Sequence, residues 1–272
     1  MPWDNPRQVP LPHDMSNSAE WFGSTACLSL FGTGAMAFTF FFRDAQTLEL
    51  LVEEALPTLC GQAFIRIWDA GCAHGPECYT LAMLLREKMS DYVFHNVRIH
   101  ATDVDRQFGP QITSGIYAQQ EVQRIPPPIR ERYFRPAMDP GRVQVTEEIR
   151  AKVSFSEHDL LSLTPPREDF SLIICKNVLL HFDEAQRLDV FRMFHRALRP
   201  GGLLATEHTQ KIPAAVGPLF QQAVSNAQIY RKIEIPSALE RDPSSGATRR
   251  VDLPGGRPVS PCGCNSQVLS GG

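Results

Sequence analysis

Strand and helix signals alternate through the middle of this 272-residue chain, and this alternation limits the fold more than any other feature. Short apolar runs typical of buried strands lie at 64–70, 97–103, 153–159, 170–177 and 203–208. Two stretches have apolar residues at helical spacing, one at 77–88 and one that runs from an N-cap residue, Asp183, to Leu198. Strands that alternate with helices of this length favour a parallel sheet covered on both faces, so we predict an open α/β fold.

The stretch at about 113–152 interrupts the alternation. It is longer than a crossover between parallel strands requires, and three consecutive prolines at 126–128 are expected to act as a stop. Residues 141–145 indicate a short strand after a Pro-Gly turn. We therefore predict a small β-rich insertion, and long insertions of this kind are usually functional.

The two ends of the chain differ from the middle. Residues 1–38 show no helical period and are expected to form an irregular or shortened N-terminal segment. Residues 236–272 are rich in Gly, Pro and Ser, so they cannot offset their ordering entropy and are expected to be disordered. The main domain is thus predicted to span 39–235. Cys262 and Cys264 have no second ligand pair nearby, so no metal site is expected there.

Charge balance and cysteine usage narrow the classes of function. Lys and Arg number 27 against 30 Asp and Glu, whereas a nucleic-acid-binding protein usually carries a basic excess. The longest apolar run, 31–42, is shorter than the roughly 20 residues of a membrane-spanning helix. An odd number of cysteines, seven, without an export signal indicates a reducing compartment. We expect a cytoplasmic protein that neither binds nucleic acid nor inserts into a membrane.

Residues suited to holding a ligand lie at the ends of four predicted strands, which is where open α/β sheets bind ligands. In chain order they are Asp69, Gly71 and Gly75, then Asp103, then Asp159 and Leu160, and finally Asn177 and His181. Glycines allow the backbone to approach a ligand closely, an acid can accept hydrogen bonds from ribose hydroxyls, and a leucine suits an adenine ring. The structural alternatives are an ordinary turn for the glycines and a helix N-cap for Asp103.

Together these residues favour a nucleoside-bearing ligand without phosphate anchors. The glycine spacing differs from the dinucleotide-binding pattern, and no phosphate-loop lysine follows. S-adenosylmethionine fits this description better than NAD or ATP. The histidines lack paired spacing on one element, so no metal site is predicted.

From about residue 38 to residue 233 the sequence resembles the CheR-type chemoreceptor glutamate methyltransferases. The segments that carry the resemblance follow the family's order: FTFFFRDAQTLELLVEEALPTL, IRIWDAGCAHGPECYTLAMLL, IHATDVD, SGIY, RYF, VSFSEHDLL, IICKNVLLHFDEAQR and LRPGGLLATEH. The second segment is specific to this family rather than to methyltransferases in general.

The resemblance implies a Rossmann-like class I methyltransferase that uses S-adenosylmethionine, releases S-adenosylhomocysteine and has a seven-stranded sheet. It implies that Thr39 and Arg43 line the methyl-donor pocket, that Glu77 meets the amino-acid end of the donor, and that Asp103 meets the ribose. Asp159 and Leu160 would lie in the adenine region, with Asn177 along the same cleft. The insertion would be the β-subdomain that docks a receptor-tail peptide in some members, and the partner would be a protein substrate such as the cytoplasmic region of a chemoreceptor.

Several positions depart from the family pattern. Pro76 and Cys78 replace residues of the donor loop, Lys176 stands for Arg, His181 stands for Tyr, and residues 207–210 read EHTQ in place of GHSE. By this resemblance the family's basic N-terminal domain is expected to be shortened here, and residues 1–38 contain Arg7 as their one Lys or Arg.

The catalytic expectations centre on Arg43 and His181. Arg43 would position the acceptor carboxylate, because its planar fork matches that group. His181 could act as a base for an amine or hydroxyl acceptor, or it could be a polar residue that fills the space of a Tyr. The leading hypothesis is methylation of a protein glutamate. The alternatives are another acceptor, or a regulatory protein that binds the donor or its product without turnover.

Overall fold

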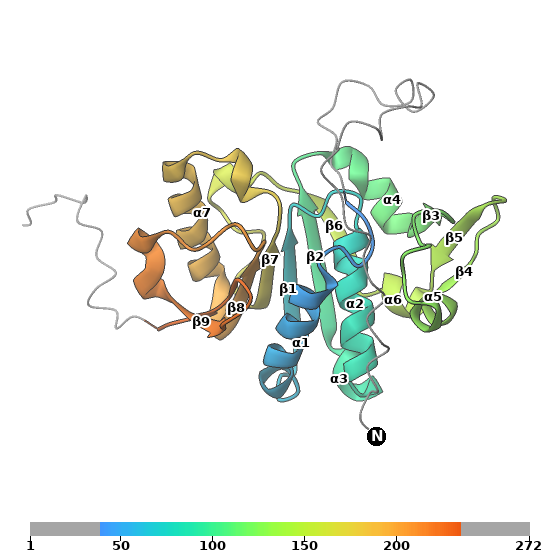
Figure 1. Ribbon diagram of the computed structural model, residues 1–272, viewed down its shortest axis with the longest axis horizontal. Coiled ribbons are helices and arrows are strands. Elements are labelled where there is room, and N and C mark those ends of the chain that lie inside the picture. Colours follow the sequence, from blue (N-terminus) through green and yellow to red (C-terminus); the bar gives the residue numbers. More distant parts are fainter. Residues whose placement is uncertain (1–38, 235–272) are drawn as a thin grey trace, which may run out of the picture. The chain divides into compact units, whose positions relative to one another are not determined.

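The computed structural model describes residues 39–234, and a seven-stranded sheet forms its centre, in the order β6-β2-β1-β7-β8-β10-β9 (Figure 1). The strands are β1 (Ile65–Ala70), β2 (Val97–Asp103), β6 (Val153–Glu157), β7 (Phe170–Cys175), β8 (Leu198–Thr206), β9 (Phe220–Val224) and β10 (Ile229–Lys232). Neighbours from β6 to β8 pair in parallel, whereas β10 pairs antiparallel with β8 and β9. The predicted α/β fold with a mostly parallel seven-stranded sheet is confirmed. The predictions for residues 1–38, for the tail at 236–272 and for Cys262 and Cys264 lie outside the described residues.

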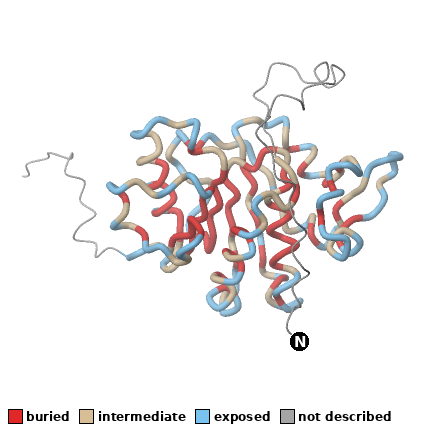
Figure 2. The backbone as a smooth tube through the Cα atoms, viewed as in Figure 1, coloured by how far each residue is buried: buried red, intermediate tan, exposed pale blue. Residues whose placement is uncertain are grey.

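Helices cover both faces of the sheet, and the central strand β7 is accordingly buried along its whole length. The longer helices are α1 (Ala45–Leu59), α2 (Pro76–Lys88) and α7 (Glu184–Ala197), and the shorter ones α3 (Asp91–His95) and α4 (Gly109–Ser114). On β1, Ile67 belongs to the core shared with α1 and α2, whereas the next residue, Trp68, packs against Phe194 of α7 at 5.3 Å between ring centroids. The strands and the inward faces of these helices form the buried interior (Figure 2). No helix within residues 39–234 has the length and apolar character needed to cross a bilayer.

The predicted boundary between the last helix and the following strand differs from the observed one. Asp183 caps α7 as expected, and its side chain forms a capping box with Gln186. The helix ends at Ala197, and β8 begins at once rather than at residue 203. Leu198 pairs with Phe170 and Leu203 with Leu172, so the Pro-Gly-Gly stretch at 200–202 forms a bulge within the strand instead of a separate turn.

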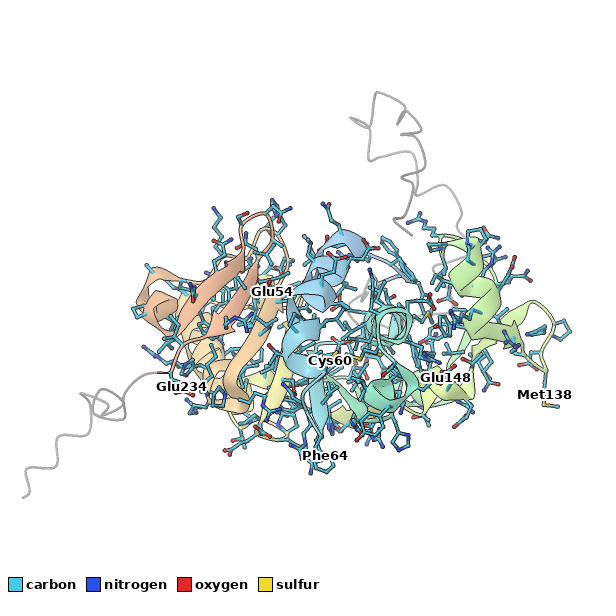
Figure 3. The ribbon with its side chains drawn as sticks, turned by 90° about the horizontal axis from the view of Figure 1, so that it is seen from below. Glu54, Cys60, Phe64, Met138, Glu148 and Glu234 are labelled. Atoms are coloured by element: carbon cyan, nitrogen blue, oxygen red, sulfur yellow. The ribbon has the colours of Figure 1, made fainter. Side chains whose placement is uncertain are left out.

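A small antiparallel sheet lies within the predicted insertion. Its strands, in the order β3-β5-β4, are β3 (Ile116–Ala118), β5 (Arg142–Val145) and β4 (Phe134–Pro136), accompanied by α5 (Pro127–Tyr133) and α6 (Glu147–Arg150). The prolines at 127 and 128 begin α5 rather than stop a helix, because the first turn needs no backbone N–H donors. Met138, in the turn between β4 and β5, is fully exposed at the far end of the insertion (Figure 3).

Candidate functional site

A cavity of about 820 Å³ lies where β1, β2, β6 and β7 end, and segments after all four strands line it. This volume is within the range of small-molecule sites. The predicted residues that line it are Thr39, Arg43, Gly71, Glu77, Asp103, Asp159, Leu160, Asn177 and His181. Asp69 and Gly75 are not among its lining residues.

The loop after β1 approaches the cavity closely because Gly71 has no side chain. Gly71 has a φ of +93°, and a Cβ atom there would lie 2.2 Å from a methyl carbon of Val178. Its N–H donates to the carbonyl of Thr102 at 2.8 Å, which fixes the loop against β2. Gly75 is the N-cap residue of α2, and Pro76 occupies the first turn of that helix. Pro76 is therefore compatible with the helix, whose first N–H groups have no intrahelical partner.

Asp103 is held by two backbone N–H groups at the edge of the cavity. Its Oδ2 accepts from the N–H of Ala73 at 3.0 Å, and its Oδ1 accepts from the N–H of Asp105 at 3.1 Å. The N-cap of the following 3-10 helix is Asp105, whose side chain accepts from Gln107. Asp103 is thus oriented by the loops after both β1 and β2, and its remaining lone pairs can accept from a ligand.

A buried cation joins the N-terminal side of the cavity to α2. Lys176 follows β7, and the exposed fraction of its side chain is 2%. Its Nζ lies 3.1 Å from Oε2 of Glu77 and 3.2 Å from Oδ2 of Asp44. Burial alone would lower the pKa of Lys176, but the two carboxylates outweigh it and raise the pKa, so the ammonium stays charged. The sequence marked Lys176 only as a replacement for Arg, and Asp44 was missed.

Apolar side chains flank the part of the cavity near Asp159. The carboxylate of Asp159 accepts from the N–H of Leu161 at 2.8 Å, and Leu160 is buried beside it. Val104 and Leu180 also line the cavity, with 67% and 47% of their surfaces exposed. Exposed aliphatic side chains at a cavity wall can cover the faces of an aromatic ring. Sequence reasoning missed both, although each is next to or near a predicted site residue.

Asn177 adopts the left-handed conformation, with a φ of 60°. Its N–H donates to Oε2 of Glu207 at 3.0 Å, and Glu207 is buried with 6% of its surface exposed. Glu207, the first residue of the EHTQ segment, therefore orients the turn that carries Asn177. His181 is exposed and lies at the end of the 3-10 helix Leu179–His181, on the same side of the cavity.

Asp69 lies within β1, so its side chain projects into the layer beside the sheet and does not line the cavity beyond the strand end. It is 1% exposed, and neither carboxylate oxygen has a hydrogen-bond partner among the described residues. Burial, followed by the nearby charge of Glu77, raises the pKa of Asp69 well above its ordinary value. In residues 39–234, no group of three or more His, Cys, Asp or Glu residues is placed to hold a metal ion.

Comparison with known proteins identifies relatives of this chain. The family model described as "CheR methyltransferase, SAM binding domain" matches residues 37–228. A probable chemotaxis protein methyltransferase of Rhizobium etli is 28% identical over 67% of this chain and 70% of its own length. Chemotaxis protein methyltransferases of Borreliella burgdorferi and Vibrio cholerae are 32% and 30% identical, each over 64% of this chain. The matches cover 64% and 62% of those two relatives, so a large part of each has no counterpart in the alignment.

The family model covers most of the described part of the chain and includes every cavity-lining segment described above. The chain belongs to the CheR methyltransferase family.

Proposed function

We propose that this protein is an S-adenosylmethionine-dependent methyltransferase that methylates a glutamate carboxylate of a protein, in the manner of a chemoreceptor methyltransferase. The observation that carries the proposal is the single cavity at four strand ends, which combines a close backbone approach at Gly71, the oriented carboxylate of Asp103 and the apolar walls Val104 and Leu180. The membership in the CheR family supports the same function. A cytoplasmic location and a chemoreceptor cytoplasmic region as partner are part of this proposal.

The cavity residues fit the donor group by group. Asp103 would accept from the ribose hydroxyls, and Leu160, Val104 and Leu180 would cover the adenine ring. The amino-acid end would lie near Glu77, whose carboxylate is 13% exposed and is fixed by Lys176. Thr39, Arg43 and Asn177 would complete the walls. When bound, S-adenosylmethionine supplies a methyl group on a positively charged sulfur.

If the acceptor is a carboxylate, the residues of this protein need to perform little acid–base chemistry. A glutamate side chain has a reference pKa of about 4.3, so it is already ionised at neutral pH and needs no base. Holding the acceptor in line with the methyl group then accounts for most of the rate, and such alignment can contribute up to about 7–11 kcal/mol. We assign the positioning of the acceptor carboxylate to Arg43, whose charge also acts on the carboxylate of Glu77.

A second candidate is methyl transfer to an amine or hydroxyl, because His181 is exposed at the cavity and could take up the proton that such an acceptor loses. Substitution His181→Phe separates the two acceptors. If the acceptor is a carboxylate, the variant should transfer methyl groups at nearly the wild-type rate at every pH from 6 to 9. If His181 acts as a base, the variant should lose most of that rate.

Calorimetry with S-adenosylhomocysteine tests the shared premise, and absence of binding at millimolar ligand would reject the proposal. Transfer of a labelled methyl group to receptor cytoplasmic fragments tests the acceptor. Label released by mild base indicates an ester, and label that resists base indicates nitrogen or carbon. Binding without transfer to any acceptor would favour a regulatory protein. Docking of a receptor-tail peptide on the small sheet is tested by adding that peptide to the protein in the calorimeter.

A further inference from the structure

We propose that Tyr117, which does not line the cavity, is a positioning residue that fixes two of the cavity walls from the small sheet. The inference rests on the proposed function, because its role is defined toward the donor site. Tyr117 is the central residue of β3 and is fully buried. It contacts both the loop after β1 and the segment 39–44, which lie far apart in the sequence.

The first contact fixes the loop that follows β1. The hydroxyl of Tyr117 donates to the carbonyl of His74 at 2.8 Å. The same hydroxyl would lie 3.1 Å from a Cβ atom at Gly75, so the ring packs directly against the turn that begins α2. Burial raises the pKa of Tyr117 well above its ordinary value, so the phenol keeps its proton and remains a donor at neutral and mildly alkaline pH.

The second contact fixes the segment 39–44. Phe41 is 1% exposed, and its ring meets that of Tyr117 edge to face, with centroids 4.8 Å apart. Phe134 of β4 packs on Phe41 in the same way at 5.4 Å. Phe41 lies between Thr39 and Arg43, both of which line the cavity. The small sheet therefore anchors the segment that brings these two side chains to the donor site.

Both walls need such support because their backbones are strained. Phe42 and Asp44 have φ values of 59° and 50°, and Ala73 in the loop has a φ of 48°. Non-glycine residues hold this conformation only where the surrounding contacts fix it. The N–H of Phe42 donates to Oγ1 of Thr80 at 3.1 Å, which restrains the segment from α2, and Phe41 restrains it from the small sheet.

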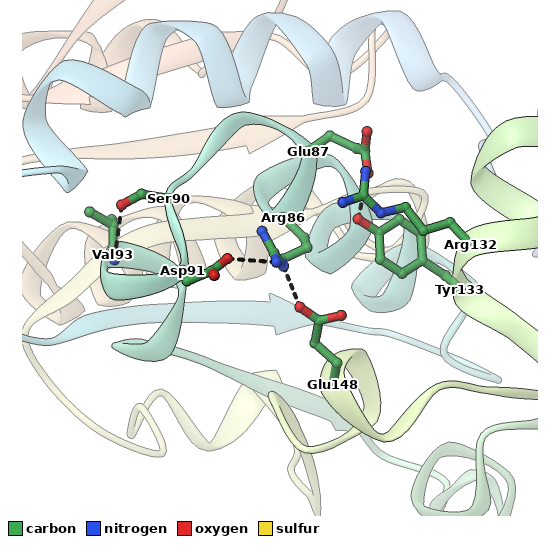
Figure 4. Close-up of polar contacts among 8 residues, drawn as sticks. All are labelled: Arg86, Glu87, Ser90, Asp91, Val93, Arg132, Tyr133 and Glu148. Carbon is green, nitrogen blue, oxygen red and sulfur yellow. Dashed lines mark hydrogen bonds and ion pairs between the residues drawn. The ribbon is translucent and has the colours of Figure 1, made fainter.

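The test is the affinity for S-adenosylhomocysteine, measured by calorimetry in three full-length proteins: wild type, Tyr117→Phe and Tyr133→Phe. Tyr133 is the matched control, since it is also a buried tyrosine of the insertion, but its hydroxyl donates to the carboxylate of Glu87, away from the cavity (Figure 4). We expect Tyr117→Phe to raise the Kd roughly three- to tenfold, as loss of one hydrogen bond implies, and Tyr133→Phe to leave it within about twofold of wild type. Thermal unfolding of all three without ligand measures the purely structural effect.

A well-folded Tyr117→Phe variant with wild-type affinity would overturn the inference, as would an equal loss of affinity in Tyr133→Phe. If Tyr117→Phe does not fold, Phe41→Leu provides the second test, because it keeps an apolar side chain but removes the ring contact, and it should weaken binding by a similar factor. Unchanged affinity in that variant also overturns the inference. A wild-type protein that does not bind the ligand rejects the proposed function itself, which distinguishes the two failures.

Discussion

The Nζ atom of Lys176 lies 3.1 Å from a carboxylate oxygen of Glu77, so a residue after β7 holds a residue in the first turn of α2. The carboxylate of Asp44, on the N-terminal side of the cavity, forms an ion pair with the same ammonium group. A cation with an exposed fraction of 2% is stable only with compensating charges nearby, and here the two carboxylates provide them.

Removing this cation should destabilise the protein. In Lys176→Met the carboxylate of Glu77 keeps its buried position but loses the ammonium that faces it, and we expect the free energy of unfolding to fall by about 3 kcal/mol. Lys176→Arg, which keeps the charge, should lose less than half of that. Urea unfolding at pH 7 measures both variants. Equal stability of the Met and Arg variants would contradict a structural role for the ion pairs.

Asp69 predicts a dependence of stability on pH. Burial raises its pKa in the folded protein above the unfolded value of 3.8. The unfolded chain therefore releases this proton first, and the wild type loses stability as the pH rises from about that value through the raised pKa. Asp69→Asn has nearly the same shape and does not titrate. It should exceed the wild type in stability by about 1–3 kcal/mol at pH 8, because on folding the wild type must either bury a charge or take up a proton, and the amide does neither.

The stability gain of Asp69→Asn should shrink as the pH falls toward 4, where the wild-type carboxyl is protonated in both states. Urea unfolding of both proteins at several pH values between 4 and 8 follows this difference. A gain that is independent of pH would show that the carboxyl of Asp69 does not titrate as we infer.

A comparison of two glycines with positive φ separates the loss of stability caused by steric crowding in the loop after β1 from the loss caused by backbone strain. Gly201 has a φ of +69° and open space around it, so Gly201→Ala should cost about 1 kcal/mol from strain alone. Gly71→Ala adds a clash with Val178, and we expect a loss of about 3 kcal/mol. Thermal or urea unfolding compares the variants. Similar losses in both would mean that Val178 moves aside freely.

Asp103 is expected to recognise the ribose. Asp103→Asn keeps one side-chain oxygen but loses the charge and one of the two hydrogen bonds from backbone N–H groups, and binding of S-adenosylhomocysteine should weaken roughly tenfold or more. An analogue without ribose hydroxyls provides the control. The wild type should discriminate against it strongly and the variant weakly, both measured by calorimetry. Equal discrimination by the two proteins would assign the ribose to another residue.

The sequence was sufficient for the parts of the site that follow from strand order. Parallel strands end at one edge of the sheet, so Asp103, Leu160 and Asn177 could be placed together before any coordinates. Asp69 does not line the cavity even though the predicted strand and the observed β1 both end at residue 70, because a residue inside the strand keeps its side chain in the buried layer beside the sheet.

The remaining features depend on contacts between distant segments. Nothing local indicates that Asp44 meets Lys176, that Tyr117 reaches His74, or that Glu207 accepts from the N–H of Asn177. The strands β9 and β10 were also not predicted individually, because FQQAV and IYRK are short and partly polar. In the sheet β9 is the edge strand, and β10 lies between it and β8.

The ion pairs of Lys176 have a consequence for biosynthesis. Asp44 and Glu77 leave the ribosome well before Lys176, so their ion pairs can form only once the chain has been made through the end of β7. Until then the two carboxylates have no cation between them, and the strained segment at 42–44 has one fewer restraint. We therefore expect the donor pocket to be completed only after β7 has emerged.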